Sequence, residues 1–196
     1  MADVTRAQAW ALLTEFTTSE SLLKHALAVE AAMRAYARRF GEEEERWAAV
    51  GLLHDFDYER HPTLAEHPMK GGEILRERGY PDDIIRAVLS HATHTGIPRD
   101  TPMAKALFAV DELTGFVTAV TLVRPGKRVA DVTVSSVKKK MKDKAFARAV
   151  SRDEIREGAE LLGVDFDAHV QTVIEAMTEA AEALGLAGEA PGPNPA

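Results

Sequence analysis

The sequence predicts an all-α protein that forms a single globular domain, and three observations lead to this prediction. Apolar residues recur along most of the chain at the three- and four-residue spacing of amphipathic helices. Glycine and proline separate these segments where helices usually begin or end. The chain has 196 residues, of which 45% are hydrophobic, enough for a sizeable core. We therefore expect one helical bundle.

Three helices are expected before residue 54. The first is a short amphipathic helix over 7–16. A longer helix follows, with Ser19 as its N-cap, and runs to about Phe40, where Gly41 supplies a stop. The third begins in the acidic cluster at 42–45, whose charge complements a helix N-terminus, and runs through Leu53.

After a loop over 57–62, helices are expected near 67–78, 82–94 and 102–122. Gly79 marks the end of the first, and Pro81 and Pro102 stand where a first-turn proline is tolerated. The segment 124–127 then interrupts the pattern. Ser151 and Glu154 have the spacing of a capping box, and apolar residues recur at helical intervals over 165–184.

These boundaries divide the domain, 1–186, into a core of about 19–123 and a helical extension over 124–186. The extension is expected to pack over the core. The last residues, 187–196, are rich in proline and glycine and are expected to be disordered.

Several classes of protein do not fit the composition. The chain has no cysteine, so it has no disulfide framework. No stretch approaches the roughly 18 consecutive apolar residues that a membrane span needs. The first residues lack the basic and apolar segments of a secretory signal, so a cytoplasmic location is expected.

The strongest chemical signal is the pair His54-Asp55, which follows the apolar run 48–53. Neighbouring helical residues point about 100° apart, so a metal ion is the most economical way to bring both side chains to one point. His25 and Asp111 also lie in apolar, helix-patterned segments. A buried carboxylate needs a partner, and imidazole with carboxylate suits Mn, Fe, Co, Ni or Zn.

The order His…His-Asp…Asp at positions 25, 54, 55 and 111 resembles the HD superfamily of metal-dependent phosphohydrolases, and the resemblance covers at least residues 19–123. It implies an HD-type helical bundle. His67 begins a His-Pro-x-x-Gly segment, and His91 follows in the next helix, as in two-metal members. The resemblance thus implies six metal ligands: His25, His54, Asp55, His67, His91 and Asp111.

The resemblance also implies roles for these residues. Asp55 is expected to be catalytic by bridging two metals, with His25, His54 and Asp111 on one ion and His67 and His91 on the other. The cofactor is expected to be one or two divalent ions (Mn, Fe, Co, Ni or Zn), and a metal-held water is the expected nucleophile.

Other polar residues near the ligands are expected to act beside the metal ions. His94 lies one turn after His91, so either imidazole fits the ligand position while the other meets the substrate; we favour His91 as the ligand and His94 at the substrate. Asp57 or Glu112 would orient a ligand imidazole or the water, although the loop position of Asp57 favours an exposed carboxylate.

The net charge and its distribution along the chain indicate which kinds of substrate the protein could bind. The net charge of −7 argues against a nucleic-acid polymer. Residues 124–148, however, contain nine Lys or Arg and two Asp, a local +7. Two interpretations of this basic segment are open: its residues border the metal cleft and bind an anionic, phosphorylated substrate, or they form a solvated helix face. The residues concerned are Arg124, Lys127, Lys138, Lys139 and Lys140.

These observations favour a hydrolase of a small phosphorylated metabolite, such as a nucleotide. The chain has His94-Thr95-Gly96-Ile97-Pro98 where cyclic-di-nucleotide phosphodiesterases carry Gly-Tyr-Pro, which argues against that specialised activity. Two alternatives stay open. The first is an oxygenase, because some HD-fold proteins use four His and two Asp for a diiron pair that cleaves a C–H or C–P bond with oxygen. The second is a non-catalytic metal-binding protein.

Overall fold

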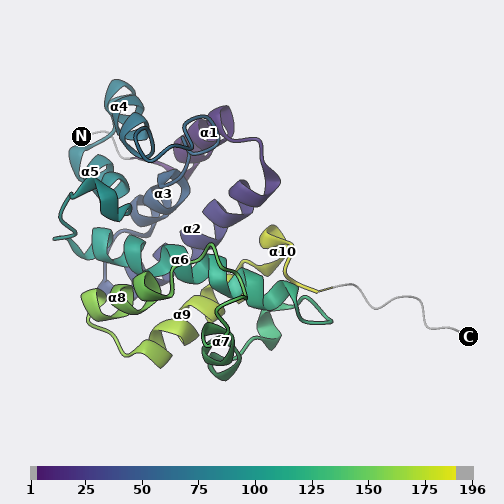
Figure 1. Cartoon of the computed structure of the whole chain (residues 1–196). Helices are drawn as coiled ribbons and strands as arrows, with labels where there is room; N and C mark the ends of the chain where they lie inside the picture. Colours follow the sequence, from purple (N-terminus) through teal and green to yellow (C-terminus); the bar gives the residue numbers. More distant parts are fainter. Residues whose placement is uncertain (1–3, 189–196) are drawn as a thin grey trace, which may run out of the picture.

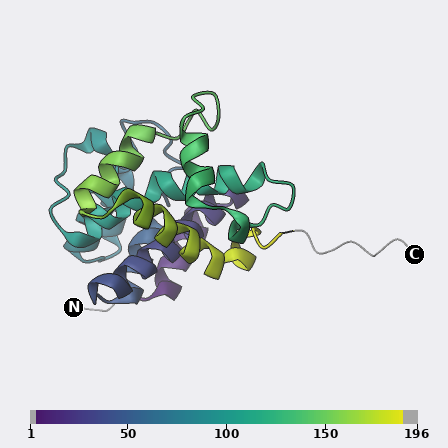
Figure 2. The same ribbon diagram turned by 90° about the horizontal axis from the view of Figure 1, so that it is seen from below.

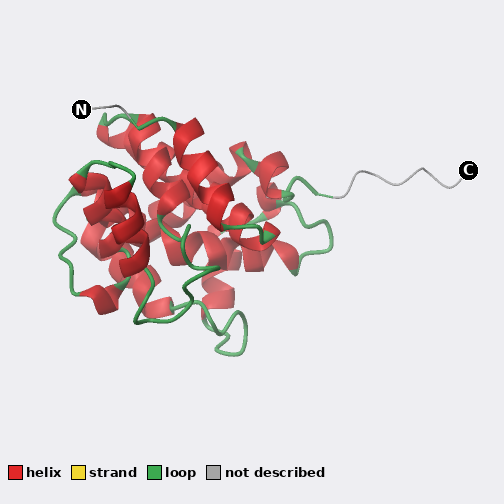
Figure 3. Cartoon of the chain, turned by 90° about the horizontal axis from the view of Figure 1, so that it is seen from above, coloured by secondary structure: helices red, strands yellow, loops and turns green. Residues whose placement is uncertain are grey.

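A computed structural model of the chain describes residues 4–188. These residues fold into ten α-helices and two 3₁₀ turns, and none of them forms a β-strand (Figures 1 and 3). The all-α prediction is therefore confirmed. The helices are α1 (Arg6–Phe16), α2 (Glu20–Phe40), α3 (Glu44–Leu53), α4 (Met69–Glu77), α5 (Asp82–Ser90), α6 (Pro102–Leu122), α7 (Val134–Met141), α8 (Arg152–Leu162), α9 (Phe166–Glu179) and α10 (Ala181–Leu184).

Helices α2, α3 and α6 form the centre of the bundle (Figure 1). A Cβ on Gly51 would stand 2.8 Å from the Cα of Glu30, so α3 approaches the backbone of α2 as closely as only glycine permits. Glu30 is itself buried and pairs with Arg6 and Arg34. This close packing holds the end of α3 against α2. In the described residues, no helix has the length and hydrophobicity to cross a membrane.

Helices α4 and α5 pack against each other at one end of the bundle (Figure 1). A Cβ on Gly72 would meet the side chain of Leu89 at 2.7 Å, which shows how closely these two helices approach. The arrangement carries His67, just before α4, and His91, the C-cap of α5, toward the end of α3.

The C-terminal helices pack across the core, as Figure 2 shows from below. Gly158 of α8 lies against Ala109 of α6, where a Cβ would stand 2.6 Å from the Cα of Ala109. On α9, the buried His169 hydrogen-bonds the hydroxyl of Tyr36 at 2.6 Å and the Ala109 carbonyl oxygen at 3.0 Å. The division into a core and an extension stays a prediction.

Some predicted boundaries were wrong. The helix expected over 82–94 ends at Ser90, and the segment 165–184 is broken at Ala180 into α9 and α10. Ser19 holds the N-cap position of α2 but makes no side-chain cap bond. In the segment expected to be disordered, Ala187 pairs with Arg128 in an isolated bridge, and the expectation itself stays a prediction. Residues 189–196 lie outside the described part of the chain.

Candidate metal centre

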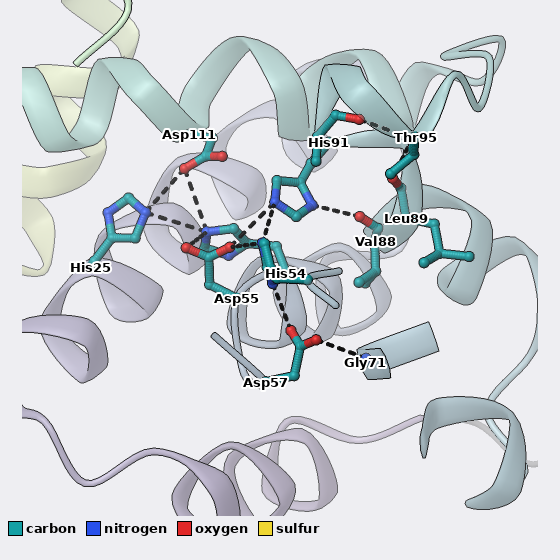
Figure 4. Close-up of polar contacts among 12 residues, drawn as sticks. His25, His54, Asp55, Asp57, Gly71, Val88, Leu89, His91, Thr95 and Asp111 are labelled. Atoms are coloured by element: carbon teal, nitrogen blue, oxygen red, sulfur yellow. Dashed lines mark hydrogen bonds and ion pairs between the residues drawn. The ribbon is translucent and has the colours of Figure 1, made fainter. Parts of the chain in front are cut away.

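The six predicted metal ligands come together from five parts of the fold. His25 lies on α2 and Asp111 on α6, while the pair His54-Asp55 directly follows α3. His67 precedes α4, and His91 ends α5. Figure 4 shows His25, His54, Asp55, His91 and Asp111 pointing toward a common centre. Residues distant in the sequence thus face one small region.

One half of the centre joins α2, α3 and α6. The Nε2 atom of His25 lies 3.0 Å from Oδ1 of Asp111 and 3.3 Å from Nε2 of His54. The Nε2 atom of His54 lies 3.4 Å from the same Asp111 oxygen. One ligand atom each from His25, His54 and Asp55 fall within 4.8 Å of one another, so this group has the spacing to hold an ion.

The other half joins the end of α3 to α4 and α5. The Nε2 atoms of His67 and His91 each lie 3.2 Å from Oδ1 of Asp55 and 3.3 Å from each other. Ligand atoms of Asp55, His67 and His91 also fall within 4.8 Å. The described residues therefore contain a second group with the spacing of a metal site.

Asp55 belongs to both groups through different oxygens. Its Oδ1 atom faces His67 and His91, whereas its Oδ2 atom lies 3.5 Å from Nε2 of His54. A carboxylate in this orientation has one oxygen available to each of two ions. The geometry fits the bridging role that the family resemblance implies for Asp55.

Three of the histidines are oriented by hydrogen bonds from their Nδ1 atoms. His54 Nδ1 lies 2.8 Å from the Gly51 carbonyl oxygen, and His91 Nδ1 lies 2.6 Å from the carbonyl oxygen of Val88. Both carbonyls only accept, so each Nδ1 carries a proton, and in the neutral ring the lone pair is then on Nε2, which faces the centre. This is the tautomer that binds a metal through Nε2.

Asp57 orients the third of these histidines. Its Oδ1 atom accepts from Nδ1 of His67 at 2.8 Å. Its Oδ2 atom accepts the Gly71 N–H at 2.7 Å, as Figure 4 shows. The expectation of an exposed loop carboxylate was wrong, because Asp57 is fully buried. The turn after α3 directs its side chain under α4, where the start of that helix supplies a donor. Asp57 thus supports a ligand imidazole.

The donor set fits divalent metal ions. The Nε2 atoms of His67 and His91 lie only 3.3 Å apart and face the same centre, so both neutral rings could bind one cation there. Burial lowers the pKa of His54, but the Asp55 and Asp111 carboxylates outweigh it and raise that pKa well above its usual range. The site therefore strongly favours positive charge at this position, whether from protons or from metal.

The centre opens into a cavity of about 650 Å³. His94 lines it, and its Nε2 atom lies 3.0 Å from the carbonyl oxygen of His67. Glu112 also lines it and accepts the Ser151 N–H at 3.0 Å. Burial, followed by the charge of Asp111, raises the pKa of Glu112 to about 7. Sequence reasoning missed the seven other lining residues: Tyr58, Leu64, Ala92, Thr93, Gly115, Val150 and Glu154.

The structure does not bring the five basic residues expected at the substrate to this cavity. The described lining of the cavity includes none of these five residues: Arg124, Lys127, Lys138, Lys139 and Lys140. For the three lysines, the reason is the packing of their helix α7 on α6 and α9, with Val137 buried. Lys138 binds Asp167 at 2.8 Å, and the ammonium of Lys140 lies 4.6 Å from the centre of the Phe146 ring.

The fold and the site together define an all-α protein with a paired His/Asp centre suited to divalent metals. Residues 22–115 match the family model described as "HD domain", and this range contains all six predicted ligands. This part of the chain therefore belongs to the HD-domain family. Members of the family are generally metal-dependent hydrolases.

The chain is also similar to curated proteins named Ribonuclease Y. The protein from Oleidesulfovibrio alaskensis is 30% identical over 111 residues, which are 56% of this chain and 20% of the relative. The protein from Fervidobacterium nodosum is 30% identical over 138 residues, 69% of this chain and 25% of the relative. The chain thus spans a quarter or less of the length of these relatives. No solved structure is significantly similar to it.

Proposed function

We propose that the protein is a metal-dependent phosphohydrolase that cleaves the phosphate ester of a small metabolite. The observation that carries this proposal is the orientation of Asp55, whose two oxygens face two different groups of histidines. Paired divalent ions supply Lewis acidity and a water of lowered pKa, which is the chemistry that phosphate-ester hydrolysis requires.

The chain's own residues have distinct parts in this proposal. His25, His54 and Asp111 would hold one ion, His67 and His91 the other, and Asp55 both. Asp57 keeps the Nε2 atom of His67 directed at the centre by accepting from Nδ1. His94, on the cavity wall beside His67, is assigned to contact with the substrate.

The test is phosphate release by the full chain reconstituted with Mn, Co, Ni, Zn or Fe(II), assayed without oxygen on a panel of phosphomonoesters. We expect two ions per chain and phosphate release. In Asp55→Asn, turnover should fall at least 100-fold, because the oxygen lost from Asp55 serves one of the two groups. Asp167→Asn on α9 is the matched control, since that carboxylate pairs with Lys138 away from the centre.

The outcomes separate this proposal from its alternatives. Full turnover by Asp55→Asn would contradict the assigned site. Product formation only with iron and oxygen, without phosphate release, would favour the diiron oxygenase. Tight metal binding with no reaction on any substrate would favour the non-catalytic protein.

RNA is a second candidate substrate, because the relatives carry the name Ribonuclease Y. The exclusion of nucleic-acid polymers stays a prediction from the net charge. The same metal-loaded preparation should therefore be assayed on a short single-stranded RNA. Cleavage of RNA with a kcat/KM above that for every phosphomonoester would replace the metabolite in the proposal.

A further inference from the structure

Gly115 occupies an unusual place in α6. It lies in the interior of a 21-residue helix, where glycine is less favourable than alanine by about 1 kcal/mol. A Cβ added at this position would meet nothing within 4 Å. Neither helix geometry nor close packing inside the described protein therefore explains the glycine. The space beside it opens on the metal-centre cavity, whose lining includes Gly115.

A second cavity begins at the same place. It has a volume of about 240 Å³ and shares both His25 and Gly115 with the lining of the metal-centre cavity. The two cavities therefore adjoin across the backbone of α6 at Gly115 and the ring of His25. A side chain at position 115 would project into the space where they meet.

The far part of the second cavity is largely apolar. Its lining includes Leu122 at the end of α6, Leu184 on α10 and Leu186 just beyond it. Leu122 is 51% exposed, so part of its apolar surface is available to a ligand. The one cation in the described lining is Lys24, which is already paired with Glu20 at 2.7 Å.

The charge of the metal-centre cavity points to the same kind of ligand. No Lys or Arg is among the described residues that line it, whereas Glu112 and Glu154 are. A polyphosphate needs several cations along its length. Here the carboxylates would repel phosphate groups that lie outside the metal ligands. The walls thus disfavour a second phosphate and leave the apolar cavity for the rest of the molecule.

We propose that the substrate is a phosphomonoester with an elongated apolar organic part, which passes over Gly115 and past His25 into the cavity lined by Leu122, Leu184 and Leu186. This inference rests on the proposed function, because it places the phosphate of the substrate at the metal centre. Gly115 is then a specificity-determining residue, because the absence of its side chain keeps the passage open.

The first test is a homologous series of n-alkyl phosphates, from ethyl to octyl, given to the metal-loaded full chain at pH 8.5. Each methylene that enters the apolar cavity should raise kcat/KM about four-fold, which corresponds to about 0.8 kcal/mol. ATP should be a poorer substrate than octyl phosphate. Equal kcat/KM values across the series, or a preference for ATP, would overturn the proposal.

The second test closes the passage. In Gly115→Leu, the ratio of kcat/KM for octyl phosphate to that for ethyl phosphate should fall at least ten-fold, and Gly115→Ala should give a smaller decrease. Using the ratio cancels any damage to the metal centre that affects both substrates. The matched control is Gln171→Leu, which adds leucine to an exposed position of α9 and should leave the ratio unchanged. An unchanged ratio in Gly115→Leu would overturn the proposal.

A binding measurement separates this inference from the proposed function. Calorimetric titration without oxygen, with ethylphosphonate and octylphosphonate, whose C–P bonds phosphohydrolases do not cleave, reports the cavity without any turnover. Tighter binding of octylphosphonate that is lost in Gly115→Leu would support the passage even if no phosphate ester were hydrolysed. If Gly115→Leu does not fold, Leu122→Gln provides the same comparison at a half-exposed position. Equal affinity of the two phosphonates for the unsubstituted protein would refute the passage.

Discussion

Adding one methyl group at Gly71 should weaken metal binding without changing any ligand. A Cβ at this position would stand 2.8 Å from Cγ of Asp57 and 3.0 Å from each of its carboxylate oxygens. These distances are too short, and the Asp57 side chain is fully buried, so Gly71→Ala must displace the carboxylate or the start of α4. Either movement disturbs the 2.8 Å contact between Asp57 Oδ1 and His67 Nδ1.

The magnitude follows from the role of Asp57. Loss of a group that orients a metal-binding histidine usually costs 10- to 100-fold in metal affinity, or about 1.4 to 2.7 kcal/mol. We expect a loss of this size for the ion held by His67 and His91. Overpacking should also lower the free energy of unfolding by about 1 to 3 kcal/mol, partly offset by the better helix propensity of alanine.

The assay is calorimetric titration of the metal-free full chain with Mn or Zn, together with urea unfolding. Lys70→Ala is the control, because Lys70 lies in the same turn of α4 but pairs only with exposed Glu73. Asp57→Asn should act like Gly71→Ala, since an amide has one oxygen for the two N–H groups that Asp57 now accepts. Two ions bound at unchanged affinity in both variants would refute the positioning role of Asp57.

Two further predictions concern stability. Burial lowers the pKa of His169 to about 4, so the folded state favours the neutral ring. The stabilisation that the neutral ring provides is complete above about pH 6.5 and is lost as the pH falls toward 4. Between pH 7 and 4, the free energy of unfolding from urea titrations should fall by up to about 3 kcal/mol more in the unsubstituted protein than in His169→Gln. The same pH dependence in both proteins would contradict this prediction. Gly51→Ala should separate α2 from α3, because its Cβ would stand 2.8 Å from the Cα of Glu30. A loss of about 1 to 3 kcal/mol and weaker metal binding are expected, and unchanged unfolding would show that the helices adapt without strain.

Helices with strong apolar periodicity or clear punctuation could be predicted from the sequence. The helix α2 ends where expected, with Gly41 in the left-handed conformation at its C-cap. By contrast, no bounds were predicted for α7, because it is only eight residues long and most of its residues are polar. Its N-terminus is marked by a capping box between Thr133 and Ser136, a signal that was present in the sequence but is weaker than the Ser151 and Glu154 spacing. Short helices of this kind depend on packing against neighbours more than on their own sequence.

The candidate ligands could be identified from the sequence, but their supporting groups could not. The importance of Asp57 depends on the turn after α3 and on the distance to Gly71, neither of which is encoded in a local pattern. The lysines at 138–140 were misleading for the opposite reason. Their charge is evident in the sequence, whereas the orientation of α7, which turns Lys138 toward Asp167, is a property of the packed bundle.

The glycines in the helices show how the fold and the site depend on each other. At Gly51, Gly71, Gly72 and Gly158, a Cβ would come within 3.0 Å of a neighbouring atom, so glycine is required by the packing that positions the metal ligands or covers them. Gly115 is the only helical glycine of the described residues where that reason is absent. Because an alanine there would stabilise α6 at no steric cost to the protein itself, a constraint from outside the protein is the remaining physical explanation. A ligand that passes between the two adjoining cavities would impose that constraint.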